Sequence, residues 1–269
     1  MRWIVAALIL IMSTGCEQAG RSAKTTQDLS LDRIKAAGKF TWGADVVGGV
    51  PYVFEDPDNP GTYIGFEVDI AKGIARHLGV RQELVIKAWD SLIPELQKQS
   101  FDMAMNGLED LEDRAKIVLF SRPYYVYTQQ LTVNKESTGI ATLADLNGHT
   151  VATLSGSAAE DILRETSGIT VRTNPEIVYS YRDLENRVVD AVLLDSPIAA
   201  AYGATNPKLK NVGDSFAEGR YVVAFRRSDT ALRDAVNSAL DAMIRSGELR
   251  RIYEQWRLMD THQQQIGVL

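Results

Sequence analysis

Residues 102–114 read DMAMNGLEDLEDR, an apolar run that leads into a polar turn and then into an acidic segment closed by an arginine. The run Met103–Met105 predicts a buried strand, because a brief apolar stretch bounded by turn residues is typical of a strand inside a sheet. Asn106–Gly107 follows directly and predicts a turn. The polar residues of this segment are therefore expected at the carboxyl end of a strand.

The sequence before this segment alternates strand and helix patterns. Phe40–Trp42 and Leu84–Ile86 are short β-prone runs. Between them, Ile70–Leu78 carries apolar residues on one helical face, and the glycine that follows is a typical helix stop. Another helix starts within Leu92–Leu96. This alternation predicts an α/β fold with largely parallel strands.

A second, similar pattern begins near Leu143 and predicts a second lobe. It continues with two apolar, β-prone stretches and three helical ones: strands at Thr150–Leu154 and Ala191–Leu194, a helix at Ala158–Glu165, and two helices through Leu232–Met243 and Leu249–Trp256. Ligands of open α/β sheets bind at the carboxyl ends of strands. We therefore expect function after Met105, after Leu194 and around Gly156.

Several segments, in order along the chain, resemble the polar amino-acid solute-binding proteins of ABC importers. Besides residues 102–125, they are Pro51–Asp56, Gly65–Ala71, Leu92–Leu96 and Val189–Asp195. The resemblance implies an α/β fold of the two-lobed, type II periplasmic-binding-protein kind, with a hinge between two mixed-sheet lobes. It implies lobe 1 at 29–124, lobe 2 at 125–220 with hinge crossings and a return to lobe 1 at 221–258. The last residues, 259–269, carry no periodicity and are expected to form a tail or the stub of a longer chain. It also implies delivery of an amino acid to the membrane subunits of an ABC transporter.

The ends of a free amino acid require a cation and an anion at a fixed separation. Arg114 is the expected carboxylate clamp, because its planar guanidinium makes two parallel bonds. The alternative is a surface arginine paired with Glu109 or Asp110. Asp195 resembles the family's anion for the α-ammonium, although an aspartate after a strand also serves as a helix cap.

Ser157 and Ala158 open a helix after a glycine turn, so their backbone N–H groups suit a carboxylate, or simply a helix cap. The resemblance also implies ligand contacts from Asn106, Gly107 and Leu108.

Acidic and aromatic residues point to the ligand's side chain. Asp45, Glu109 and Asp195 together favour a basic or amide side chain, with arginine, lysine or glutamine as the expected ligands, because like charges in a closed cleft repel an acidic one. Trp89 matches the aromatic that stacks on this side chain, where a cation over its face adds about 0.5–2 kcal/mol. Tyr52 substitutes for an absent second aromatic, or fills the core.

The first sixteen residues form a secretory leader, with one arginine, an apolar run and a small-residue ending before Cys16. The ending resembles a lipoprotein cleavage box, which implies lipidation of Cys16 and anchoring to a membrane, although Ser13 stands where the box usually has leucine. The alternative is a plain signal peptide. Polar residues 17–28 predict a flexible tether. Either way, we expect a periplasmic or cell-surface protein.

Composition excludes several other functions. A net charge of −6 argues against nucleic-acid binding. The histidines at 77, 149 and 262 lack ligand spacing, so we expect no metal and no cofactor. We expect a monomeric binder and no enzyme. Two rivals remain: a cyclohexadienyl dehydratase-like enzyme on the same scaffold, with Glu109 as general acid, or a sensing or importer module of a longer fused chain.

Overall fold

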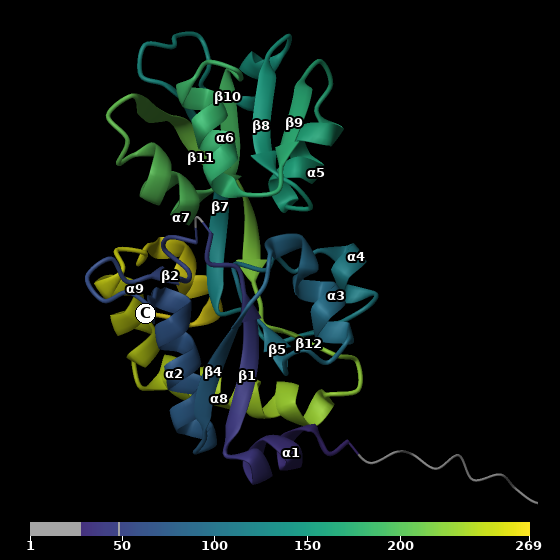
Figure 1. Ribbon diagram of the computed structural model, residues 1–269. Coiled ribbons are helices and arrows are strands. Elements are labelled where there is room, and N and C mark those ends of the chain that lie inside the picture. The colour runs from purple at the N-terminus through teal and green to yellow at the C-terminus, as the bar shows by residue number, and fades with distance from the viewer. Residues whose placement is uncertain (1–27, 48) are drawn as a thin grey trace, which may run out of the picture.

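Two mixed sheets, one in each lobe, form the framework of the protein (Figure 1). The computed structural model describes residues 28–47 and 49–269; the predicted leader, Cys16 and nearly all of the predicted tether lie outside them. No helix in these described ranges is long and apolar enough to cross a membrane. The predicted α/β fold with two mixed-sheet lobes is confirmed.

The sheet of lobe 1 has the strand order β4-β1-β5-β12-β6, in which β4, β1 and β5 are parallel and β12 is antiparallel to both of its neighbours, β5 and β6. Its strands are β1 (Lys39–Ala44), β4 (Arg81–Ile86), β5 (Met103–Ala104), β6 (Leu119–Phe120) and β12 (Ala224–Phe225), with a separate hairpin of β2 (Phe54–Glu55) and β3 (Tyr63–Ile64). The helices of this lobe are α1 (Ser30–Ala37), α2 (Phe66–Leu78), η1 (Trp89–Ser91), α3 (Leu92–Gln97), α4 (Glu112–Ala115), α8 (Thr230–Arg245) and α9 (Glu248–Gln255).

The sheet of lobe 2 has the order β11-β7-β10-β8-β9, in which β10, β8 and β9 run parallel. Its strands are β7 (Tyr125–Asn134), β8 (Thr150–Leu154), β9 (Thr170–Asn174), β10 (Ala191–Asp195) and β11 (Leu209–Tyr221). Its helical segments are η2 (Leu143–Leu146), α5 (Ala158–Glu165), α6 (Ile177–Glu185), α7 (Ser196–Ile198) and η3 (Ala199–Gly203).

The long strands β7 and β11 pass from one lobe to the other (Figure 1). They pair antiparallel where they cross, with Tyr125 opposite Tyr221 and Tyr127 opposite Gly219. The ring of Tyr221 stacks against those of Tyr125 and Tyr127, at centroid distances of 5.7 and 4.6 Å. A Cβ on Gly219 would lie 2.2 Å from the Tyr127 ring, so the close stack requires glycine there. The crossing is thus a two-stranded ribbon stiffened by aromatic contacts.

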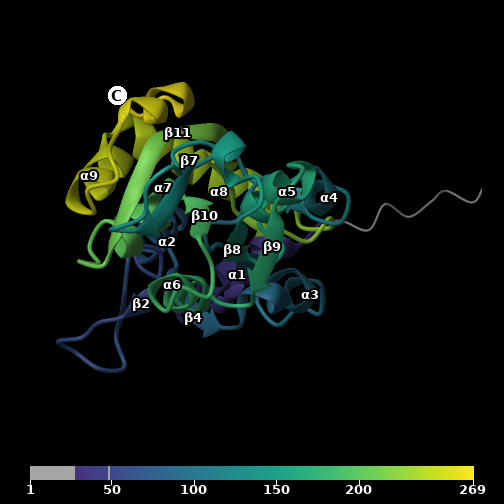
Figure 2. The same cartoon turned by 90° about the horizontal axis from the view of Figure 1, so that it is seen from above.

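The prediction that residues 259–269 form a tail is wrong. They contain the 3₁₀ helix η4 (Thr261–Ile266), which packs against β7, and Figure 2 shows the C-terminal elements beside β11 and β7. Gln263 is fully buried, accepts a hydrogen bond from Val126 N (3.0 Å) and donates one to Val126 O (2.8 Å). One glutamine therefore fastens the C-terminal segment to a crossing strand.

Candidate functional site

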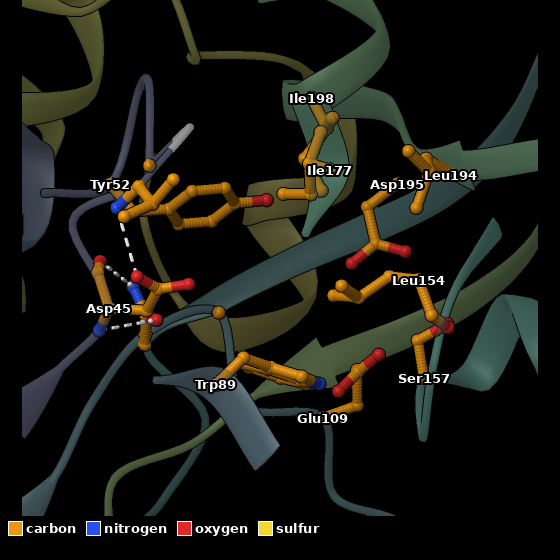
Figure 3. Close-up of a pocket in the computed structure, with 14 residues that line it drawn as sticks. Asp45, Tyr52, Trp89, Glu109, Leu154, Ser157, Ile177, Leu194, Asp195 and Ile198 are labelled. Carbon is orange, nitrogen blue, oxygen red and sulfur yellow. Dashed lines mark hydrogen bonds between the residues drawn. The ribbon is translucent and has the colours of Figure 1, made fainter. Parts of the chain in front are cut away.

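A pocket lies between the two lobes (Figure 3). Lobe 1 contributes the loops after β1 and β5 and the helix η1, and lobe 2 contributes the ends of β8 and β10, the N-cap of α5, the start of α6 and the end of α7. The described residues that line it are Asp45, Val47, Gly49, Tyr52, Trp89, Asn106, Gly107, Glu109, Leu154, Ser157, Ile177, Leu194, Asp195 and Ile198. This lining includes three carboxylates and, among the described residues, no lysine, arginine or histidine.

One amide side chain joins the two loops of lobe 1 at the pocket. Asp45 N donates to Asn106 Oδ1 (2.9 Å), and Asn106 Nδ2 donates to Asp45 O (3.3 Å). The next residue, Gly107, has a φ of +62°, and a Cβ there would lie 2.8 Å from the ring of Tyr52. Glycine thus lets Tyr52 approach the loop and form one wall of the pocket.

Glu67, in the first turn of α2, supports this loop from behind. Its Oε1 accepts hydrogen bonds from Gly107 N (2.6 Å) and from the hydroxyl of Tyr124. The side chain is buried, and burial raises the pKa of Glu67 from 4.5 to about 7, because a charged carboxylate loses its hydration there.

Asp195 ends β10 and is the acidic residue of lobe 2 in the pocket. Gln129 Nε2 donates to its Oδ1 (2.7 Å) and the Tyr221 hydroxyl donates to its Oδ2 (2.5 Å). Both donors are uncharged. Burial, and next the charge of Glu109, raise the pKa of Asp195 well above its usual value. A ligand ammonium beside Asp195 would offset both effects.

A second acidic contact joins the lobes at Asp45. Its carboxyl group meets that of Glu176, the residue before α6, and the two can hydrogen-bond to each other only when one carries a proton. Burial, followed by the charge of Asp45, raises the pKa of Glu176 to about 7. Burial also raises the pKa of Asp45. This pair is therefore a place where a cation would be stabilised.

The guanidinium of Arg114 binds a carboxylate, but that carboxylate belongs to the protein. Arg114 Nη1 donates to Glu109 Oε2 (2.6 Å) and to Glu109 O (3.1 Å), and Nη2 donates to Gly156 O (2.6 Å). The other carboxylate oxygen, Glu109 Oε1, accepts from Ala158 N at the start of α5 (3.0 Å). Ser157 caps the same helix by accepting from Glu160 N.

Trp89 contacts both lobes and Arg114. Its indole Nε1 donates across the cleft to Ser155 O (2.9 Å), and the Arg114 guanidinium carbon lies 5.2 Å from the ring centroid. In Figure 3 Trp89 and Tyr52 lie on opposite sides of the space between Asp45 and Asp195. The two rings are thus placed as walls for a ligand that reaches from one acid to the other.

Most of the residues predicted to bind ligand line the pocket: Asp45, Tyr52, Trp89, Asn106, Gly107, Glu109, Ser157 and Asp195. The predictions of ligand contact through Leu108, Arg114 and Ala158 find no support there. Leu108 is buried and lines a separate groove. Its carbonyl accepts a hydrogen bond from Val222 N, which holds the loop after β5 in place. Arg114 and the backbone amide of Ala158 both donate hydrogen bonds to Glu109 instead. For Arg114, this is the pairing with Glu109 that the sequence offered as the alternative.

Two groups of site residues were missed by the sequence reasoning. One is the apolar lining of lobe 2, which consists of Leu154, Ile177, Leu194 and Ile198. The other is Glu176, which follows the carboxyl end of β9. The rule that ligands bind after strands would have found it, had β9 been recognised as a strand.

The described residues contain no cluster of three or more histidine, cysteine or acidic side chains that could hold a metal ion. Each histidine lies near a carboxylate instead: His77 near Glu248, His149 near Asp190 and His262 near Glu218.

Two lobes, two crossing strands and a pocket between the lobes define a protein that binds a small solute by closure. Residues 46–259 match the bacterial extracellular solute-binding proteins, family 3, and the chain belongs to that family. The L-cystine-binding protein TcyJ of Escherichia coli (strain K12) is 33% identical over 88% of this chain and 90% of its own length. The arginine-binding extracellular protein ArtP of Bacillus subtilis (strain 168) is 30% identical over 94% of this chain and 95% of its own.

Solved structures agree with this assignment. The arginine-bound form of truncated ArgBP from T. maritima has a TM-score of 0.74 and 35% identity, over 79% of this chain and 99% of that one. These relatives are solute-binding proteins and not enzymes. The geometry also disfavours the dehydratase alternative, because both carboxylate oxygens of Glu109 are already engaged as acceptors by Arg114 and Ala158 N.

Proposed function

We propose that this protein captures a small cationic solute between its lobes and delivers it to the membrane subunits of an ABC importer. The observation that carries the proposal is the lining of the pocket, where Asp45 and Asp195 face a space with no basic lining residue among those described, while Glu109 is paired with Arg114. The ligand class is that of arginine and lysine, with an ammonium group and a second cationic group. Glutamine, the third ligand expected from the sequence, has only one cation to offer.

Closure follows from the placement of the acids. Asp45 belongs to lobe 1, whereas Glu176 and Asp195 belong to lobe 2. A ligand that contacts both lobes binds the closed form better than the open form, and it shifts the equilibrium by that difference in affinity. The closed form is the signal that the importer's membrane subunits would recognise, and a single chain is sufficient for it, so we propose a monomer.

The test is calorimetric titration of the mature protein with arginine, lysine, glutamine, glutamate and their amine derivatives. We expect cationic compounds to bind and glutamate not to bind. Asp195→Asn should weaken the binding of cations by about 2 kcal/mol, or about 30-fold, because it removes one partner of a buried charge pair. Asp190→Asn, at the exposed start of the same strand, is the control and should change little. Tight binding of glutamate, or an unaltered Asp195→Asn variant, would refute the proposal.

We further propose that Cys16, which lies outside the described residues, is lipidated and holds the protein at a membrane surface. Support comes from the leader and the small residues before Cys16. Expression of the full chain should give a membrane-bound protein, and expression of the Cys16→Ser variant should give a released one. Equal partition of both into the soluble fraction would contradict the anchor.

A further inference from the structure

The carboxylate of Glu109 takes the place that the sequence reasoning assigned to a ligand's carboxylate. That reasoning required a guanidinium from lobe 1 and a helix N-terminus from lobe 2, and both are present. Arg114 Nη1 lies 2.6 Å from one oxygen of Glu109, and Ala158 N lies 3.0 Å from the other. Glu109 is only 2% exposed, so these bonds are sheltered from water.

A ligand carboxylate would have to displace this internal one. Glu109 is tethered next to its donors and loses no translational freedom when it binds them, whereas a free ligand does. The remaining contacts of Arg114, to Gly156 O and to the face of Trp89, hold the guanidinium outside the pocket lining. The two donors for a carboxylate are therefore already used.

The part of the pocket that stays available suits positive charge at two ends. Asp45, with Glu176 beside it, lies at one end, and Asp195 lies at the other (Figure 3). Tyr52 and Trp89 form walls between these ends. Among the described residues no lysine, arginine or histidine forms an ion pair with Asp45, Glu176 or Asp195. Burial raises the pKa of Glu176 and of Asp195, as expected where acids lack a cation.

We propose that the pocket selects small molecules with a cationic group at each end and no carboxylate, because Glu109 supplies the carboxylate from within the protein. The chemical class is that of diamines and amino-guanidines, the decarboxylated counterparts of lysine and arginine. This inference rests on the proposed capture of a cationic solute and narrows its substrate class.

The experiment compares two matched ligand pairs, agmatine with L-arginine and cadaverine with L-lysine, by calorimetric titration of the wild-type protein. Within each pair the molecules differ only by the carboxylate. Of agmatine and cadaverine, we expect the one with the higher affinity to bind at least ten-fold more tightly than the amino acid from which it derives. If arginine or lysine binds as tightly as its amine, the inference fails while the proposed function stands. If none of the four compounds binds, the proposed function itself fails.

Variants at Glu109 give the reciprocal test. Glu109→Ser frees Arg114 and the Ala158 amide for a ligand carboxylate, so binding of arginine relative to agmatine should rise at least ten-fold. Glu109→Gln keeps the shape but loses the charge, and serves if the serine variant does not fold. Glu112→Ser changes an exposed glutamate in α4 and should leave the preference as it is. An unchanged preference in both folded Glu109 variants would overturn the proposal.

Discussion

The buried carboxyl group of Glu67 should make the folded state less stable as the pH rises from 4.5 to 7. Its Oε1 accepts bonds from Gly107 N and the Tyr124 hydroxyl, but no cation among the described residues offsets the charge. In this pH range the unfolded chain releases the proton, whereas the folded protein keeps it. The folded state binds more protons, so a rise in pH favours unfolding.

The magnitude follows from the two pKa values of Glu67, about 7 in the folded protein and 4.5 in the unfolded chain. Each pH unit between them costs about 1.4 kcal/mol, so the group destabilises the protein by about 3 kcal/mol once the pH exceeds both values. Glu67→Gln removes this cost and keeps Oε1 as the acceptor of both hydrogen bonds. The stability of Glu67→Gln relative to wild type should therefore rise by about 3 kcal/mol between pH 4 and pH 8.

The assay is urea unfolding of both proteins at pH 4, 5, 6, 7 and 8, with the free energy of unfolding extrapolated to zero urea. Other acids titrate in this range, but they titrate in both proteins, and the difference isolates Glu67. Glu112→Gln, which changes a side chain that is 91% exposed, is the control and should follow the wild type at every pH. A stability difference between the wild type and Glu67→Gln that stays constant across this range would refute the reasoning.

Two further predictions concern the geometry around the pocket. Gly65→Ala should destabilise the protein far more than Gly61→Ala in urea unfolding. Both glycines have positive φ, and an alanine in such a conformation costs about 1–3 kcal/mol. Only at Gly65 would the added Cβ also overlap a backbone atom, 1.9 Å from Tyr52 O. Equal losses would contradict this. Trp89→Phe removes an interlobe hydrogen bond worth about 1 kcal/mol, so the unliganded protein should shift about five-fold toward the open form in small-angle scattering. Trp256→Phe, which loses a bond within lobe 1, should leave the scattering unchanged, and a similar expansion in both variants would argue against the interlobe role.

The strands that could be predicted carry a run of apolar residues, whether that run is buried, as in β10, or partly exposed, as in β4. Thr150–Leu154 has the same bounds in the sequence interpretation and in the structure, because its apolar run has no competing pattern. β9 was missed, because its first four residues alternate between exposed and partly buried and only Val171 in the strand is apolar. Because β9 was not recognised as a strand, Glu176, which follows it, was not predicted as a site residue. Periodicity likewise ignores Gln263, whose polar side chain fastens the C-terminal segment to β7.

The partner of Arg114 could not be settled from the sequence. Arg114 and Glu109 are five residues apart, and whether they meet depends on the turn before α4 and on the approach of α5 from the other lobe. Sequence reasoning treated the carboxylate of Glu109 as a source of repulsion for an acidic ligand side chain. In the structure it is a bonded group with two donors, and this changes which ligands the pocket suits.

The two sides of the cleft play opposite parts in closure. On one side the protein fastens itself, since Trp89, Glu109 and Arg114 of lobe 1 all bind the backbone of 155–158, the turn between β8 and α5. On the other side Asp45 and Glu176 come together as like charges when both are ionised, which opposes closure. A bound cation would add little to the contacts with residues 155–158, but it would remove the repulsion between Asp45 and Glu176. Under the proposed function, the ligand would therefore act on closure mainly through its positive charge between Asp45 and Glu176, and a second cation at Asp195 would fix the length of molecule that can do so.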